Sequence, residues 1–221
     1  MNISVITPPP FEPVSLEDVY GHLRLDVEGS PPTHPDDTQI DSFIAAAREF
    51  VEKSTHRSLV TQTLRLSAAG FPVCALPWGY TSLLPPRFQP PHHIYLKHPP
   101  VQSITSVKYY DIDNILQTVD AANYYLTDDD VPELRFVTNF SAPSTYDRPD
   151  ALRVEYVAGY APDGSPPESR ADYVANVPKS LVSAVLVGVQ LQYDSLPPAN
   201  MQALSDMREA FMRSYCVTVA V

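Results

Sequence analysis

Two marked helix starts, followed by a change of hydrophobic period, constrain the fold of this chain more than any other feature, and all lie within Val14–Leu66. Ser15 and Asp18 have the spacing of a helix N-terminus, where side-chain oxygens accept hydrogen bonds from free backbone amides. Thr38 and Asp41 repeat this spacing before a longer helix. Beyond that helix, apolar residues recur at every second position, which is typical of a strand. The segment therefore predicts a helix, an acidic loop, a second helix and directly a strand.

Both periodic elements predict one packed side. In the second helix the apolar residues recur at helical spacing. They are Ile40, Phe43, Ile44, Ala47 and Val51. In the following strand, one side carries Val60, Gln62, Leu64 and Leu66. We therefore expect the helix to pack on one face and to meet solvent on the other.

The middle of the chain is rich in β-strand patterns. Several short runs alternate between apolar and polar residues and are separated by turn signals. The expected strands are Ile94–Leu96, Val101–Tyr110, Tyr124–Thr127, Glu133–Phe136 and Leu152–Tyr156. They predict an antiparallel sheet or a small barrel.

Helices return after this β-rich segment. Pro178 occupies a favoured first-turn position before a helix that is apolar around most of its circumference, so we expect that helix to be buried. Asn200 is expected to cap a last helix. The apolar stripe of that helix comprises Leu204, Met207, Phe211 and Tyr215.

Together these elements predict an α+β fold. A small helical bundle of about four helices forms the body, and a central antiparallel β-rich segment is inserted into it. We expect one composite domain with residues 1–58 as the N-terminal helical part and 59–160 as the β-rich insertion. Residues 161–221 would supply the C-terminal helices and a terminal tail.

The charge balance of the 221-residue chain argues against a protein that grips nucleic acid. The chain has 15 basic and 26 acidic residues, a formal net charge of −11, and no basic run. A secretory signal is lacking, and the most apolar run, Leu181–Leu191, is about half of the ~20 residues that a membrane span needs. Cys74 and Cys216 lack a metal-type spacing and are expected to be reduced. We expect a soluble protein made in the cytoplasm, without membrane contact.

No catalytic or metal-binding pattern stands out, so we expect neither enzymatic activity nor a cofactor. Nucleophile-elbow, phosphate-loop, dinucleotide-turn and zinc-protease patterns are absent from the sequence. Asp111 and Asp113 resemble the opening of a calcium loop, but Ala122 occupies the twelfth position, where a glutamate is required. A hairpin turn is the better interpretation. The three acids Asp128–Asp130 are interpreted as a solvated turn.

The C-terminal segment Cys216–Val221 is uncharged and β-prone, so it is costly to leave in water. Two interpretations stay open. The segment either returns as an edge strand of its own domain, or it adds to or inserts into another subunit. In both cases we expect it to be covered.

Four blocks of sequence follow one another in a recognisable order along most of the chain. They are PVSLEDVYGHLRLD (Pro13–Asp26), IAAAREFVEKSTHRSLVTQTLRL (Ile44–Leu66), LKHPPVQSITSVKYYD (Leu96–Asp111) and VEYVAGY (Val154–Tyr160). In this order they resemble the head-tail connector, or adaptor, proteins of long-tailed bacteriophages and related gene-transfer particles. The chain departs from the family in length, with a longer Gly29–Asp37 loop and a longer proline-rich run at Leu83–His98, which includes Pro85–Pro91.

The resemblance implies a structural virion protein of the neck, at the head-tail junction. Many copies, in this family a dodecamer, would form a ring that joins the capsid portal protein to the next head-tail stopper or tail-completion protein. DNA would pass through the lumen during assembly and ejection without specific binding. Twelve copies at −11 each carry about −130, and this charge would repel DNA wherever it faced the lumen.

The resemblance also implies a partner-binding element. In connectors the C-terminal segment docks into the portal ring, which would make Met201–Val221 the portal-facing part of this chain. The expected anchors are Phe211, Met212, Tyr215, Val217, Val219 and Val221.

Tyrosine is abundant, with 13 residues and two doublets on strands that we expect to be adjacent. The doublets are Tyr109 with Tyr110 and Tyr124 with Tyr125. In a connector we expect these strands to make subunit–subunit contacts. The alternative is a carbohydrate- or protein-binding β module with an exposed tyrosine face, since tyrosine combines a large contact area with a polar tip. Simple cross-strand packing is the third interpretation.

Overall fold

The computed structural model describes residues 1–72, 93–127, 129–163, 167, 169–194 and 197–217. The chain forms two compact units, and each is assembled from two separate stretches of sequence. The β unit comprises Met1–Pro8 and Gln62–Ala158, and the helical unit comprises Pro9–Thr61 and Gly159–Val221. Helices and antiparallel sheets together confirm the predicted α+β class.

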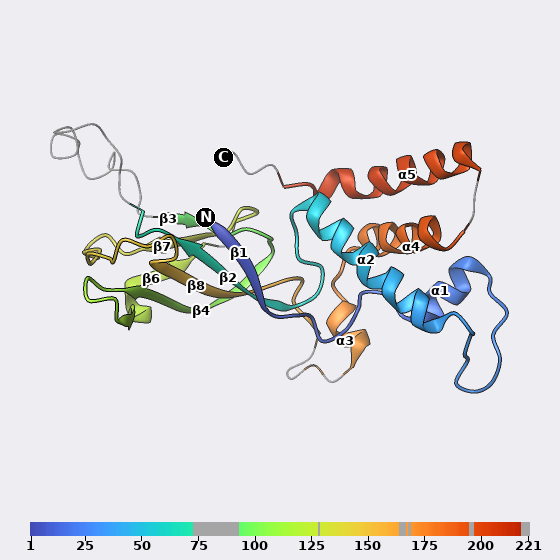
Figure 1. The fold of residues 1–221 in the computed structure, drawn as a ribbon, viewed down its shortest axis with the longest axis horizontal. Coiled ribbons are helices and arrows are strands. Elements are labelled where there is room, and N and C mark those ends of the chain that lie inside the picture. Colours follow the sequence, from blue (N-terminus) through green and yellow to red (C-terminus); the bar gives the residue numbers. More distant parts are fainter. Residues whose placement is uncertain (73–92, 128, 164–166, 168, 195–196, 218–221) are drawn as a thin grey trace. The chain divides into compact units, whose positions relative to one another are not determined.

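The β unit contains two antiparallel sheets (Figure 1). The larger sheet is formed by β1 (Asn2–Thr7), β2 (Gln62–Ala68), β4 (Val101–Tyr110), β5 (Leu116–Thr118) and β8 (Leu152–Ala158), in the order β1-β2-β8-β4-β5. The smaller sheet is formed by β3 (His93–Tyr95), β6 (Tyr124–Leu126) and β7 (Glu133–Phe136), in the order β3-β7-β6. A short 3-10 turn, Ala121–Asn123, leads from the first sheet into the second.

Alternation of buried and half-buried side chains builds the core of the β unit. Every second residue of β2 and β8 is buried. The two strands pair so that Leu64 lies opposite Tyr156 and Leu66 lies opposite Val154. Leu134 of β7 belongs to the same apolar cluster, which therefore draws on both sheets. The five strands predicted in the middle of the chain are confirmed.

The sequence pattern does not predict β1 or β5. Five of the six residues of β1 are exposed, and so are all three residues of β5. Asn2–Val5 alternates between polar and apolar residues over only four positions, and β5 has only three residues, so both patterns are too short to stand out in the sequence. Both strands lie at the edges of the larger sheet.

The helical unit contains five helices among the described residues. They are α1 (Leu16–Leu23), α2 (Asp37–Thr55), α3 (Arg170–Val174), α4 (Lys179–Tyr193) and α5 (Pro198–Met212), and a 3-10 turn, Arg213–Tyr215, follows α5. The burial predicted for the helix after Pro178 is confirmed, because Leu181, Val185 and Val189 of α4 are fully buried. α4 packs against both α2 and α5. No helix in the described ranges is long and apolar enough to cross a membrane.

The predicted start of α1 is confirmed by a reciprocal pair of hydrogen bonds. The Ser15 hydroxyl accepts from the Asp18 amide (3.1 Å), and the Asp18 carboxylate accepts from the Ser15 amide (2.7 Å). Arg170, the first residue of α3, donates to the same carboxylate (2.6 Å) and to the carbonyl of Pro13 (3.0 Å). The cap of α1 thus also fixes the start of α3.

The other two predicted helix caps are wrong. Thr38 lies inside α2, which begins one residue earlier, after Asp36. Asn200 lies inside α5, whose first residue is Pro198. Proline suits a first helical turn because its φ angle is already fixed near the helical value and it has no amide to leave unpaired.

The connection back from β8 into the helical unit depends on one glycine. Gly159 has a φ of +116°, which side chains rarely tolerate. A Cβ added there would lie 2.4 Å from the carbonyl oxygen of Val60. Only glycine allows this close approach.

Replacing Gly159 by alanine should lower the free energy of unfolding by about 3 kcal/mol, because backbone strain and overlap with Val60 add up. Urea denaturation followed by circular dichroism measures the loss. The control is Gly21→Ala in α1, where nothing lies within 4 Å of the added Cβ and a gain of up to about 1 kcal/mol is expected. Equal stability of the Gly159 variant and the wild type would contradict this account.

Candidate functional site

The C-terminal segment is fixed to the end of α2. The Val217 amide donates to the Thr55 carbonyl (3.0 Å), and the Arg57 Nε donates to the Tyr215 carbonyl (2.8 Å). The Cys216 thiol lies 3.7 Å from the Ser54 carbonyl, which accepts from it. The last described residues of the chain are therefore attached to the helical unit at a defined point.

The predicted partner-binding residues fall into three groups. Met212 and Val217 are buried within the helical unit. Phe211 and Tyr215 are half-buried and pack against its core. Val219 and Val221 lie outside the described residues. Whether any of these side chains contacts a partner stays a prediction.

The helix α5 leaves much apolar surface exposed. Among its residues only Met212 is buried, whereas Met201 and Met207 are exposed. Met207 therefore does not contribute to the packed stripe that the sequence predicts. The Arg208 guanidinium lies 3.8 Å from the centre of the exposed Phe50 ring, and burial lowers the pKa of Arg208.

Two surface hollows border α5. The first is lined by Leu191, Pro198, Met201, Gln202, Ser205 and Arg208. The second is lined by Phe50, Ser54, Glu209, Met212, Arg213 and Cys216. The second hollow borders the point at which Cys216 is attached to α2. Exposed methionines and adjoining hollows make α5 the part of the helical unit best suited to contact another protein.

The tyrosine doublets do not form one face. β4 belongs to the larger sheet and β6 to the smaller, so the prediction of adjacent strands is wrong. The chain crosses between the sheets through the 3-10 turn that precedes Tyr124, which sequence alternation does not reveal. Tyr109 and Tyr124 pack against the core cluster, whereas Tyr125 is exposed. Tyr110 lies against two arginines.

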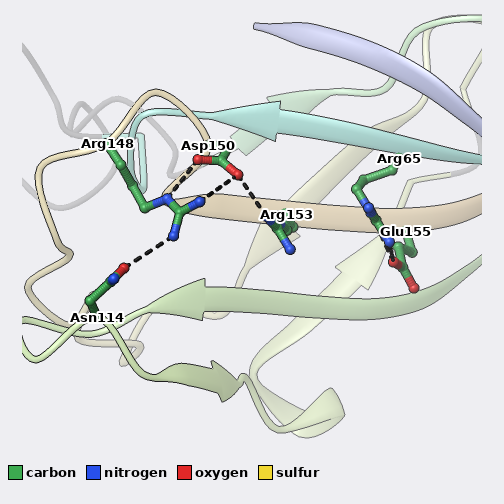
Figure 2. Close-up of polar contacts among 6 residues, drawn as sticks. All are labelled: Arg65, Asn114, Arg148, Asp150, Arg153 and Glu155. Carbon is green, nitrogen blue, oxygen red and sulfur yellow. Dashed lines mark hydrogen bonds and ion pairs between the residues drawn. The ribbon is translucent and has the colours of Figure 1, made fainter.

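Those arginines belong to a cluster on the larger sheet, which Figure 2 shows. Asp150 accepts hydrogen bonds from Arg148 (2.6 and 3.0 Å) and from Arg153 (2.6 Å). These bonds lower the pKa of Asp150 to about 2. Arg148 also donates to Asn114 (3.1 Å) and stacks on the Tyr110 ring, 3.8 Å from its centre. The cluster ties the start of β8 to the turn between β4 and β5.

A second ion pair lies further along the same face (Figure 2). Arg65 of β2 stands directly opposite Glu155 of β8 and donates to its carboxylate (2.6 and 3.0 Å). The hydrogen bond from Arg65 lowers the pKa of Glu155. The sequence does not reveal this pair, although the alternation of β8 places Arg153 and Glu155 on the side opposite its apolar residues.

Chemically, these groups do not form a catalytic or metal site. The carboxylates of Asp150 and Glu155 are engaged by arginines. In the described ranges no group of His, Cys, Asp or Glu side chains could hold a metal ion. Asp111 serves the hairpin turn that the sequence predicts, where its carboxylate accepts from the amides of Asp113 (3.1 Å) and Ile115 (2.9 Å).

No family model matches the chain, and no curated protein matches it. Solved structures of phage-like particles, however, contain chains with the same fold along the full length. A chain in the neck of an empty GTA particle, computed with C6 symmetry, superposes with a TM-score of 0.70 at 18% identity, covering 100% of this chain and 98% of that one.

Two further structures agree. A chain in the neck of a native GTA particle, computed with C12 symmetry, gives a TM-score of 0.63 at 16% identity, with the same coverages of 100% and 98%. A chain in the virion of a native gene transfer agent (GTA) particle gives a TM-score of 0.63 at 17% identity, and the match covers 100% of this chain and 98% of that one. The resemblance to connectors of gene-transfer particles is therefore confirmed at the level of the fold.

Replacing Asp150 by asparagine should lower the midpoint of thermal unfolding at pH 7 by roughly 2–4 °C. The folded-state pKa of Asp150 is depressed from 3.8 to about 2, so its stabilisation is present above pH 3.8 and is lost as the pH falls toward about 2. Circular dichroism should show the two midpoints converging over this range. Asp129→Asn, in an exposed turn, is the control. A difference that persists below pH 2 would rule out the ionic origin.

Replacing Arg57 by methionine should loosen the C-terminal attachment and leave the fold intact. Loss of the hydrogen bond to Tyr215 costs about 1 kcal/mol, so the Val217 amide should exchange about fivefold faster. Hydrogen exchange read by mass spectrometry measures this. Lys53→Met is the matched control, since Lys53 is exposed at the same end of α2. Unchanged exchange at Val217 would show that the Arg57 bond does not hold the segment.

Proposed function

We propose that this protein is a structural component of the neck of a phage-like particle. In this proposal many copies form a ring that joins the capsid portal to the next tail-completion protein and lets DNA pass. The observation that carries it is the full-length match of fold to chains in the necks of gene transfer agent particles. Necks computed with C6 and C12 symmetry support a cyclic homo-oligomer.

The exposed surface of α5 supports a partner at the C-terminal end of the chain. The 15-residue helix α5 packs against α4 but fully buries only Met212, and its exposed Met201 and Met207 favour contact with another protein. The backbone groups of Tyr215 and Val217 are held at the end of α2, which fixes the last described residues of the chain. We therefore propose that Met201–Val221 faces the portal.

The proposal requires that DNA passes without being held. The chain carries a net charge of −11, which opposes binding to phosphate backbones. The arginines on and beside the larger sheet are not free to bind phosphates, because Arg65, Arg148 and Arg153 each donate to a carboxylate. The matched chains are structural parts of particles, and we propose no catalytic role.

Changing Met201 and Met207 together to serine should weaken binding to the portal about tenfold, because two exposed apolar contacts are lost from α5. The measurement is co-purification of portal protein with the tagged full-length chain from cells that produce the particles, quantified by mass spectrometry. Val27→Ser, an exposed apolar residue outside α5, is the control and should bind like wild type.

Two results would contradict the proposal in different ways. Full recovery of portal by the double variant would place the contact elsewhere on the chain. Recovery of no virion protein by the wild type, together with binding to glycans, would replace the neck role by the carbohydrate-binding alternative.

A further inference from the structure

Both edges of the larger sheet are open among the described residues. The strand order β1-β2-β8-β4-β5 leaves β1 at one edge and β5 at the other, and no described strand pairs with their outer sides. Figure 1 shows β1 running along the margin of the β unit beside β2. Open strand edges present unpaired backbone donors and acceptors, to which another chain can add.

The β1 edge lacks two of the usual means of blocking such pairing. Met1–Thr7 contains no charged side chain and no proline, although its pairing with β2 shifts register between Val5 and Thr7. Its apolar side chains are also accessible, since 55% of Val5 and 41% of Ile6 are exposed. An edge of this kind is expected to be covered in the functional state.

The opposite edge carries a second apolar patch. In the hairpin between β4 and β5, 67% of Ile112, 58% of Ile115 and 43% of Leu116 are exposed. The hairpin is held in shape by Asp111, whose carboxylate also accepts from the Gln117 side chain (2.8 Å). The hydrogen bond from Arg148 to Asn114 fixes the tip from the other side (3.1 Å). These isoleucines are therefore presented on a shaped turn.

The two edges suit a head-to-tail contact between copies. A closed ring needs two different complementary patches on each subunit, whereas pairing of β1 with β1 would close a two-fold dimer and stop. Here two different apolar edges belong to one sheet of one compact unit. Chains of the same fold occur in necks computed with C6 and C12 symmetry.

We propose that β1 of one copy docks against the β4–β5 hairpin of the next copy, so that the larger sheets continue from subunit to subunit around the ring. Val5 and Ile6 then meet Ile112, Ile115 and Leu116 of the neighbour. This contact rests on the proposed ring and specifies the surface that closes it.

Cysteine cross-linking tests the contact. The double variant Val5→Cys with Leu116→Cys, made in full-length protein that also carries Cys74→Ser and Cys216→Ser, is mixed with portal protein and treated with a short bifunctional thiol reagent. We expect a ladder of covalent oligomers on a denaturing gel, with each single variant staying monomeric. The matched control pairs Leu116→Cys with Tyr95→Cys, an exposed residue on the edge of the smaller sheet, and should give no ladder.

The possible failures are distinguishable. Rings seen by electron microscopy without a ladder would overturn the β1–hairpin contact and leave the proposed function standing. Dimers from Val5→Cys alone would replace the contact by β1–β1 pairing. If neither rings nor a ladder form when portal is present, both proposals are contradicted.

A charge variant gives an independent reading of the same contact. Val5→Lys introduces a charge at the open edge without filling a buried site, so the monomer should fold as judged by circular dichroism. We expect the concentration needed for ring formation to rise at least tenfold, whereas Tyr95→Lys should leave it unchanged. Normal rings from Val5→Lys would overturn the proposal.

Discussion

The backbone of Leu59 is the constraint on which the connection out of α2 depends. Its amide donates to the buried carboxylate of Glu52 (2.8 Å), and its carbonyl accepts from the Tyr160 amide (3.4 Å). Arg48 donates to the same carboxylate (2.8 Å), which keeps the buried charge paired. Together with the close approach of Gly159 to Val60, these contacts hold the segment that follows α2 against the segment that follows β8. Every strand from β2 to β8 lies between these two segments in the sequence.

In this chain the residues that hold the fold differ from those that remain accessible at the surface. Met212 and Val217, expected as partner anchors, are buried in the helical unit and so attach the C-terminal segment to its own core. Several of the exposed apolar residues lie instead on α5, on β1 and on the hairpin after β4. A side chain that is already buried in its own unit cannot also be buried by a partner. We therefore expect a partner to contact the exposed apolar residues, unless the C-terminal segment detaches from α2.

The sequence predicts those parts whose residues alternate between buried and exposed positions. β2 and β8 could be predicted from the sequence because every second side chain is buried. α4 could be predicted because almost all of its circumference is apolar. β1 was not predicted, since its alternation of polar and apolar residues covers only Asn2–Val5. Arg148 and Asp150 lie in a proline-containing turn, and only the fold brings them to Arg153 and Asn114. The expected adjacency of the strands that carry the tyrosine doublets was wrong because sheet membership is a long-range property, whereas their role in subunit contacts stays a prediction.

Exposed patches at several edges also bear on how such a subunit assembles. Each patch consists of a few side chains, far fewer than the 20–30 residues a side, roughly, that a stable pairwise interface uses. A single contact of that size dissociates readily, but in the proposed ring every copy would be held by two neighbours at once, and the proposed portal contact would add a third. In the proposed assembly, weak and distinct patches would therefore hold only where several contacts form together. Such an arrangement needs several small exposed edges and no large continuous apolar surface.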